Sequence, residues 1–307
     1  MDRPHGVGVL GLGTIGRMIA NELSESHRFD VVAVFDPALD QGSGYTAADS
    51  AESVCADPRV ACVYVASPPR SHAEGVDLAI KHRKAILCEK PLAPTPEEAD
   101  RLAAAVTSAG LPNVVNFGFH TLSTGRSLQH AVRQRLLGRV ETAHIEVGIA
   151  AWPQGWHAQA GPWLTSPDQG GFTREVVTHF MALADQLFGE GILERAEVHR
   201  GPDGLETRVT ATVRYGDVAL SLGAHLDPTI ESDSDMTSRF TVRCGGGDMA
   251  IVDWMTPIGI PFVDPRPEGI ADALAVHLDG RESGLQDFAA GARVSRLIEG
   301  ILSGDVH

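Results

Sequence analysis

The 307-residue sequence predicts an α/β domain with a parallel, doubly wound sheet over residues 1–119, followed by an α+β domain with an open, largely antiparallel sheet over residues 120–307. Strands and helices alternate through the first third of the chain, as they do in parallel sheets. Three glycines, Gly11, Gly13 and Gly16, follow the first strand. Later in the chain apolar and polar residues alternate with period two, which indicates antiparallel strands with one buried face.

The first domain begins with an apolar run at residues 6–10, the three glycines, and a helix that carries Ile15, Ile19 and Leu23 at helical spacing. A second strand, at residues 31–35, ends at Asp36. Further elements are predicted as strands at 60–66, 85–88 and 114–117 and as helices around 74–81 and 96–109. Thr95 and Gly110 are suited to begin and end the last of these helices.

The second domain opens with a helix that carries Leu128, Val132 and Leu136 and stops at Gly138. Residues 209–215 alternate strictly between apolar and polar side chains, and the following Gly216-Asp217 predicts a hairpin turn. Residues 245–248 predict a second turn. The apolar face of such a sheet has to be covered by the helices predicted at 171–188 and 285–302 or by another subunit, so we expect self-association.

Charge and composition exclude several classes of partner. The net charge is -15 and the basic residues do not cluster, so nucleic acid and anionic membranes are not expected partners. No apolar run is long enough to cross a bilayer and no targeting segment precedes the first strand, which predicts a cytoplasmic protein. The four cysteines, Cys55, Cys62, Cys88 and Cys244, lack metal-site spacing and are interpreted as reduced packing residues, and no metal site is expected.

The glycines predict a dinucleotide site. The first allows a tight turn, the second lets backbone approach a pyrophosphate, and the third lets the helix pack closely with its N-terminus, Thr14 and Ile15, at the anion. Asp36 follows at the offset expected for a carboxylate that binds the adenosine ribose hydroxyls. Because this carboxylate repels a 2′-phosphate and no basic residue follows it closely, NAD is preferred over NADP.

Two further groups of residues indicate chemistry. Lys90 follows the strand at 85–88, and ligands of open α/β sheets bind beyond the carboxyl ends of the strands, although a solvated surface lysine is the alternative. Glu175 and His179 lie four positions apart, so on a helix the carboxylate can orient the imidazole as a general base. The alternative is an exposed helical pair without function.

These residues resemble the Gfo/Idh/MocA superfamily of oxidoreductases (glucose-fructose oxidoreductase, inositol dehydrogenase and rhizopine catabolism) over almost the whole chain. The resemblance rests on the glycines and on four further motifs: Ser67-Pro68-Pro69 with His72, Cys88-Glu89-Lys90-Pro91-Leu92, Gly170-Gly171 leading to Glu175 and His179, and Leu285-Gln286-Asp287-Phe288. It implies an N-terminal Rossmann dinucleotide-binding domain, a C-terminal substrate domain, and a homodimer or homotetramer. It also implies that Lys90 contacts nicotinamide and substrate, that His179 exchanges a proton with the reacting oxygen, and that Ser67, Pro68, His72 and Glu89 belong to the cofactor site.

Several residues depart from the family pattern and bear on the substrate. Glu175 stands where aspartate is more frequent, and Arg174 before it is either a pocket residue for an acidic substrate or, as we favour, a surface residue. Gly118, Phe119 and His120 stand where the family usually carries an asparagine and a basic residue, which makes this part of the pocket more apolar. Trp152 and Trp163, with Trp156 and His157 between them, are either aromatic walls for a sugar ring or ordinary packing residues.

The resulting hypothesis is reversible hydride transfer to or from a carbinol carbon of a sugar, cyclitol or related polyol. His179 removes the hydroxyl proton, Glu175 orients His179, and Lys90 stabilises charge on the oxygen. The alternatives are an imine or dihydrodiol oxidoreductase of the same superfamily and a non-catalytic protein that binds the cofactor.

Overall fold

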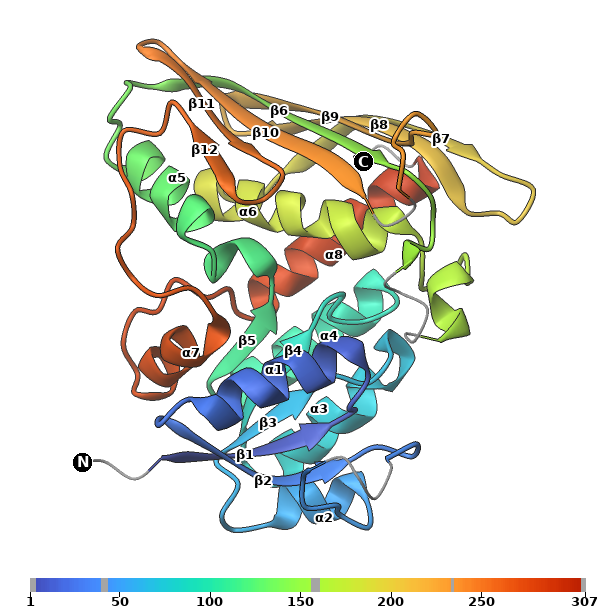
Figure 1. Ribbon diagram of the computed structural model, residues 1–307, viewed down its shortest axis with the longest axis vertical. Coiled ribbons are helices and arrows are strands. Elements are labelled where there is room, and N and C mark those ends of the chain that lie inside the picture. Colours follow the sequence, from blue (N-terminus) through green and yellow to red (C-terminus); the bar gives the residue numbers. More distant parts are fainter. Residues whose placement is uncertain (1–3, 40–43, 156–160, 233–234, 305–307) are drawn as a thin grey trace. The chain divides into compact units, whose positions relative to one another are not determined.

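The computed structural model describes residues 4–39, 44–155, 161–232 and 235–304. Contacts divide the chain into two compact units (Figure 1). Unit 1 comprises residues 1–117 and 269–292, and unit 2 comprises residues 118–268 and 293–307. Residues 269–292, which the sequence analysis assigns to the second domain, therefore group with the first.

Unit 1 contains a five-stranded parallel sheet in the order β2-β1-β3-β4-β5, which confirms the predicted Rossmann domain. Its strands are β1 (His5–Leu10), β2 (Phe29–Phe35), β3 (Cys62–Val65), β4 (Ala85–Glu89) and β5 (Asn113–Asn116). The connecting helices are α1 (Thr14–Glu25), α2 (Ala51–Ala56), α3 (His72–Lys81) and α4 (Pro96–Ala109). The predicted caps of α4 are present: Thr95 Oγ1 accepts the N–H of Glu98, and Gly110 is left-handed with φ 65°.

The helix α7 (Ile270–Leu278) belongs to the core of unit 1. Ile270 and Leu274 are buried in the same hydrophobic cluster as Val9 of β1 and Leu23 of α1. At the start of α7 the N–H of Ala271 donates to the Glu22 carboxylate at 2.8 Å. This return of the chain explains why a segment late in the sequence groups with the Rossmann domain.

Unit 2 contains a seven-stranded sheet in the order β12-β11-β10-β6-β9-β8-β7, in which β6 and β9 form the one parallel pair. The strands are β6 (Val140–Ile149), β7 (Ile192–Arg200), β8 (Glu206–Tyr215), β9 (Val218–Leu226), β10 (Met236–Cys244), β11 (Gly247–Val252) and β12 (Thr256–Ile258). The predicted hairpin at Gly216-Asp217 joins β8 to β9. The prediction of an open, largely antiparallel sheet is confirmed.

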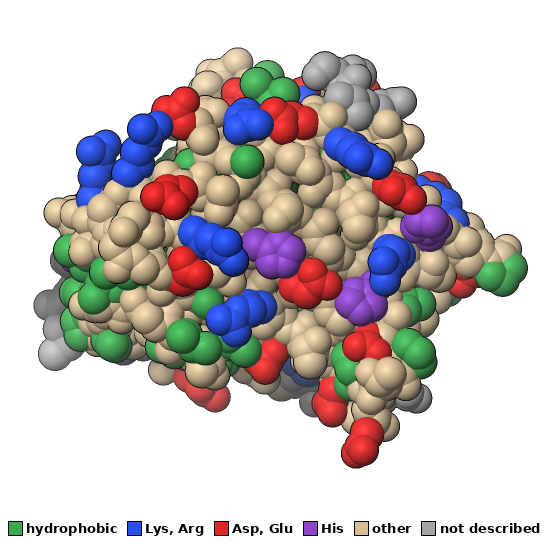
Figure 2. All heavy atoms as spheres, turned by 90° about the horizontal axis from the view of Figure 1, so that it is seen from above, with side chains coloured by type: hydrophobic (Ala, Val, Ile, Leu, Met, Phe, Trp, Pro, Cys, Tyr) green, Lys and Arg blue, Asp and Glu red, His purple; other side chains and the backbone are tan. Residues whose placement is uncertain are grey.

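Helices cover one face of this sheet, and polar side chains cover the other. The helices α5 (Ser123–Arg133) and α6 (Thr178–Phe188) and the end of α8 (Phe288–Ser303) lie under the sheet (Figure 1). The opposite face carries charged side chains of both signs interspersed with histidines (Figure 2). The apolar face is therefore covered within the chain, which removes the sequence-based argument that a second subunit has to cover it.

The cysteines, the helices and the clusters of metal-binding residue types bear on what the composition predicted. All four cysteines are free and buried, as predicted. Among the described residues, no helix is long and apolar enough to span a membrane, and no cluster of His, Cys, Asp and Glu side chains is arranged to hold a metal ion.

Candidate active site

The glycine loop between β1 and α1 has the geometry of a dinucleotide cradle. Gly11 has φ +99°, and a Cβ there would lie 2.5 Å from the backbone nitrogen of Ser67. A Cβ on Gly16 would lie 2.5 Å from the carbonyl oxygen of Gly11, so both positions require glycine for packing. Gly13 differs, because a Cβ there would meet nothing within 4 Å. The open space beside Gly13, at the N-terminus of α1, fits the pyrophosphate of NAD.

Asp36 ties the end of β2 to this loop. Its Oδ2 accepts the N–H of Leu12 at 2.6 Å, and its Oδ1 accepts the N–H of Ala38 at 2.7 Å. Each carboxylate oxygen has a second lone pair for a further donor. Asp36 is therefore oriented by the backbone on both sides while it keeps acceptor capacity for ribose hydroxyls.

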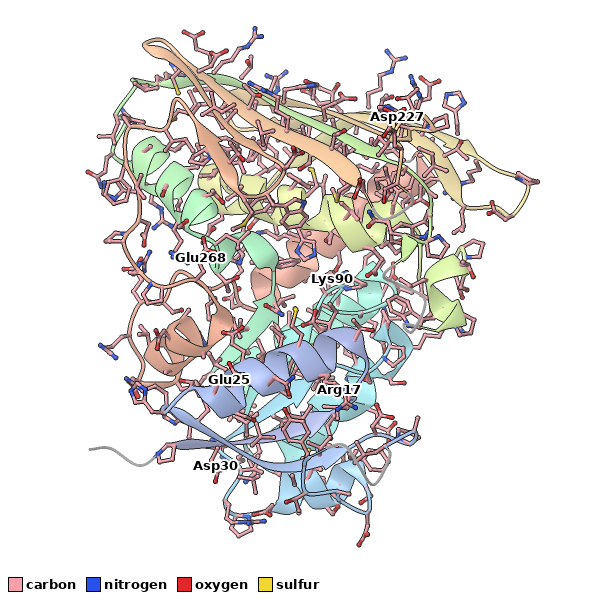
Figure 3. All side chains as sticks on the ribbon, viewed as in Figure 1. Arg17, Glu25, Asp30, Lys90, Asp227 and Glu268 are labelled. Carbon is pink, nitrogen blue, oxygen red and sulfur yellow. The ribbon has the colours of Figure 1, made fainter. Side chains whose placement is uncertain are left out.

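A buried polar network lies at the ends of the three adjacent strands β3, β4 and β5. Glu89 is 8% exposed, and its Oε1 accepts the Tyr64 hydroxyl at 2.8 Å and the Asn116 amide at 2.6 Å. Burial raises the pKa of the Glu89 carboxyl, while the hydrogen bonds from Asn116 and Tyr64 and the charge of Lys90 oppose the rise. β4 ends at Glu89, so Lys90 is the first residue after the strand, and its side chain is half-buried (Figure 3).

His72 connects the two loops on which the predicted cofactor residues lie. Its ring is fully buried, with Nδ1 3.0 Å from the Pro91 carbonyl and Nε2 2.8 Å from the Ser67 carbonyl. Burial lowers the pKa of His72, and the backbone carbonyls oppose this effect. Because both ring nitrogens face carbonyl oxygens of the protein, His72 holds the Ser67-Pro68 turn against the segment after Lys90.

In unit 2, His179 lies near the start of α6 in an aromatic environment. The N–H of Gly118 donates to Nδ1 of His179 at 3.0 Å. The indole of Trp254 meets the imidazole edge to face, with ring centroids 5.2 Å apart, and stacks on Phe119 at 4.7 Å. His179 and Trp254 are both half-buried.

The turn before His179 explains the Gly170-Gly171 pair. A Cβ on Gly170 would overlap the carbonyl of Leu164, and Gly171 is left-handed with φ +97°. A Cβ on Gly171 would lie 2.5 Å from a carboxylate oxygen of Glu206, which is 2% exposed and accepts the N–H of Thr173 at 2.7 Å. The glycines thus make room for a buried carboxylate at the start of the helical segment.

The segment between these glycines and His179 is wider than an α-helix. Residues Thr173–Val177 form a π-helical turn, and α6 begins at Thr178. Glu175 therefore lies on the π turn and His179 on the α-helix, so their spacing of four does not have the regular α-helical geometry from which their pairing was predicted. Orientation of His179 by Glu175 stays a prediction.

Arg174 is not the surface residue that the sequence favoured. It is 7% exposed, and its Nε and Nη2 pair with the two carboxylate oxygens of Glu299 at 2.5 and 2.7 Å. Its Nη1 donates to the carbonyls of Pro167 and Gly170. The guanidinium thus joins the glycine turn to α8, which gives it a structural task in place of a substrate carboxylate.

The remaining candidate substrate residues lie in unit 2. His120 is 4% exposed on a short 3-10 turn, and the Trp152 indole donates to the Leu164 carbonyl at 3.1 Å, close in sequence to half-buried Trp163. Trp156 and His157 lie outside the described residues. The sequence indicated Gly118 only as part of an apolar pocket wall. Sequence reasoning missed Trp254 and Glu206, because only the folding of distant segments brings them to His179 and to the glycine turn.

Comparison with known proteins identifies the family. Residues 5–117 match the family described as "Oxidoreductase family, NAD-binding Rossmann fold", GFO_IDH_MocA. Residues 5–117 are thus the NAD-binding domain of a Gfo/Idh/MocA oxidoreductase. The predicted nucleotide, NAD, agrees with this family description.

Several relatives of the chain have names that state an activity. Over 222 residues, 68% of this chain and 65% of the relative, it is 26% identical to 1,5-anhydro-D-fructose reductase of Ensifer adhaerens. It is 28% identical to inositol 2-dehydrogenase 2 of Paenarthrobacter aurescens, over 78% of this chain and 72% of the relative. The chain thus spans slightly less than two thirds of the anhydrofructose reductase.

Among solved structures, levoglucosan dehydrogenase in complex with NADH and L-sorbose superposes on this chain with a TM-score of 0.80 at 18% identity. The superposition covers 99% of this chain and 97% of that one, which shows a shared fold.

Proposed function

We propose that the whole chain is an NAD-dependent oxidoreductase of the Gfo/Idh/MocA superfamily that interconverts a carbinol and a carbonyl group on a sugar, cyclitol or related polyol. The match of residues 5–117 to an NAD-binding oxidoreductase family carries this proposal. The open space beside Gly13 supports it, and so do the names of relatives that act on anhydrofructose and inositol. NADP is the less favoured cofactor because Asp36 places a carboxylate at the end of β2.

The proposed reaction uses one residue from each unit. Bound NAD would supply the hydride acceptor or, when reduced, the hydride donor. Lys90, held by the buried Glu89 network, and His179, held by Gly118, both act on the reacting oxygen, one as the proton carrier and the other as a hydrogen-bond donor. Glu175 orients His179 in this proposal.

The test is a change in nicotinamide absorbance when purified protein is mixed with NAD or NADP and a panel of sugars, cyclitols, their keto forms, cyclic imines and dihydrodiols. Turnover of a polyol or keto sugar with NAD is expected. Turnover confined to imines or dihydrodiols would contradict the substrate class. Tight binding of NADH without turnover on the whole panel would indicate a non-catalytic protein.

Replacing Lys90 or His179 by alanine should lower kcat by ~10²–10⁴-fold, the range for a lost acid-base group, and leave the affinity for NADH within about threefold of the wild type. Lys81→Ala is a matched control, because Lys81 is exposed on α3 and pairs with Glu52. Full turnover in both the Lys90 and the His179 variants would remove these residues from the mechanism.

Two wider properties belong to the same proposal. We infer a cytoplasmic enzyme that forms a homodimer or homotetramer through the exposed face of the seven-stranded sheet. The family resemblance supports the assembly, and the described residues place no helix on that face of the sheet, which leaves room for it (Figures 1 and 2).

A further inference from the structure

The hydrogen bond to His179 restricts where the ring can carry its proton. Nδ1 lies 3.0 Å from the backbone nitrogen of Gly118, which can only donate. Nδ1 must therefore present its lone pair, and a neutral imidazole with a lone pair on Nδ1 carries its hydrogen on Nε2. A hydrogen on Nδ1 would point at the N–H of Gly118.

Trp254 holds the imidazole in this orientation. Trp254 follows Asp253 in the turn between β11 and β12. The φ angle is 46° at Asp253 and 64° at Trp254. A bulky residue rarely adopts this left-handed backbone, so the turn is fixed by its surroundings. Asp253 Oδ1 accepts the N–H of Ser238 at 2.8 Å, and the Trp254 carbonyl accepts the Thr124 hydroxyl at 2.7 Å.

Contacts on both sides of the indole complete the arrangement. Trp254 stacks on Phe119 with ring planes 9° apart and meets His179 at 68°. A Cβ on Gly118 would lie 3.1 Å from Cζ3 of Trp254 and 3.7 Å from Nδ1 of His179. Glycine at position 118 therefore lets the backbone N–H, the indole and the imidazole come together.

We propose that Gly118 and Trp254 are positioning residues that hold His179 as a neutral imidazole with its hydrogen on Nε2. In the proposed reaction, on which this inference rests, His179 donates a hydrogen bond to the reacting oxygen and does not take its proton. During oxidation the O–H bond breaks, the proton forms an N–H bond with the side-chain nitrogen of Lys90, and His179 keeps its own hydrogen. During reduction the Lys90 ammonium returns that proton to the oxygen. This reverses the roles that the sequence alone suggested for Lys90 and His179. It also replaces Glu175 as the residue that orients His179, because Nδ1 accepts from Gly118 and the N–H of Nε2 is donated to the reacting oxygen, which leaves no N–H for a carboxylate.

Nitrogen-15 NMR of the imidazole tests the tautomer without any turnover. The resonances of His179 are assigned by their loss in the His179→Gln variant. In the wild-type protein at neutral pH the shifts should report a protonated Nε2 and an unprotonated Nδ1. A protonated Nδ1, or a cationic ring, would overturn the proposal.

The positioning role of Trp254 has its own readout. Trp254→Ala should give a mixture of the two tautomers, because the ring is no longer held against Gly118, and Trp254→Phe should restore the Nε2–H form. Unchanged His179 shifts in the alanine variant would show that Trp254 merely packs the fold. Met255→Ala is a matched control, since Met255 is 52% exposed in the same turn.

Turnover of His179 variants separates a hydrogen-bond donor from a base. The amide nitrogen of His179→Gln can replace the Nε2–H donor, so this variant should retain activity within ~10-fold of the wild type, while His179→Ala loses ~10²–10³-fold, the range for a lost hydrogen-bond donor to the reacting oxygen. His179→Asn, whose shorter side chain places its amide nearer Nδ1, should behave like alanine. A glutamine variant as slow as alanine would overturn the donor role. Absence of turnover on every substrate, with the tautomer still on Nε2, would instead refute the proposed function.

Discussion

At the residue scale, Glu89 combines burial with a network that lies beside Lys90. Tyr64 and Asn116 share its Oε1, and burial also raises the pKa of Tyr64, so the phenol stays a donor. The carboxyl of Glu89 itself has a raised pKa. This buried carboxyl beside Lys90 therefore makes part of the domain's stability depend on pH.

The free energy of unfolding should reveal this dependence. In the unfolded chain Glu89 ionises near pH ~4.3, and in the folded chain it ionises at a higher pH. Between these two values the folded state binds more protons, so stability is complete below the lower value and falls as the pH rises through the higher one. The free energy of unfolding can be measured by chemical denaturation from about pH 4 to about pH 8, a range that covers these values. It should decline less with pH for Glu89→Gln than for the wild type. Glu25→Gln, at an exposed position on α1, is the control (Figure 3), and equal slopes for all three proteins would refute the argument.

Gly11 and Gly13 of the glycine loop have different roles: Gly11 is required for packing, and Gly13 is proposed to lie at the bound pyrophosphate. Gly11→Ala should destabilise the protein by about 1–3 kcal/mol or more, because its left-handed backbone and the Ser67 nitrogen leave no place for a Cβ. Gly13→Ala should keep the wild-type stability and weaken NADH binding by ~10-fold or more, since its Cβ would enter the open space at the pyrophosphate site. Thermal unfolding and fluorescence titration with NADH measure the two effects. The reverse assignment, a stable Gly11 variant and an unfolded Gly13 variant, would contradict the loop geometry.

At the element scale, the π turn at Thr173–Val177 is held from three sides. Gly170 and Gly171 permit close approach of Leu164 and Glu206, and Arg174 pairs with Glu299 of α8. π turns are frequent at functional sites, and this one lies immediately before His179. The helix that carries the proposed functional histidine is thus positioned by contacts that its own sequence does not show.

Loss of the Arg174 guanidinium should lower the free energy of unfolding, because Arg174 ties the π turn to α8 through Glu299. Arg174→Met should cost about 3 kcal/mol, because the side chain is buried and Glu299 and two carbonyls would lose their donor. Adding Glu299→Leu should recover part of the loss, since the unpaired carboxylate is removed. Arg214→Met, which breaks an exposed pair with Glu194, should stay within about 0.5 kcal/mol of the wild type. Urea denaturation measures all three, and an Arg174 variant as stable as the Arg214 variant would refute the structural role.

At the scale of the whole molecule, the outer face of the seven-stranded sheet determines how copies could meet. Polar contacts such as His144–Glu146 and ion pairs such as Arg214–Glu194 lie at exposed strand positions. Interfaces of this composition depend on pairing of charges more than on apolar area. Any assembly through this face should therefore be sensitive to substitution of these charged side chains.

The mass in solution tests the assembly. Light scattering should give two or four times the chain mass of 32.6 kDa, and reversing one charge by Arg214→Glu should shift the distribution toward smaller species. Arg59→Glu, in an exposed pair of unit 1, is the control. A monodisperse monomer of the wild-type protein would contradict the assembly.

Local patterns in the sequence were sufficient for the fold class and for the positions of the candidate residues in unit 1. The glycines after β1, Asp36 at the end of β2 and Lys90 after β4 each follow a strand directly, and the parallel sheet brings such strand ends to one edge. The hairpin between β8 and β9 and the caps of α4 depend on a few adjacent residues. Such features could be predicted because their physical causes lie within a few positions of each other.

Tertiary structure alone decided what surrounds those residues. His179 receives its hydrogen bond from a residue 61 positions earlier, and Arg174 pairs with one 125 positions later. The return of residues 269–292 to the Rossmann core and the π turn before His179 likewise depend on packing between segments far apart in the chain. Periodicity and spacing report which residues share a strand or a helix face, whereas the partners of a buried polar group are set by whichever distant donors and acceptors the folded chain brings within hydrogen-bond distance.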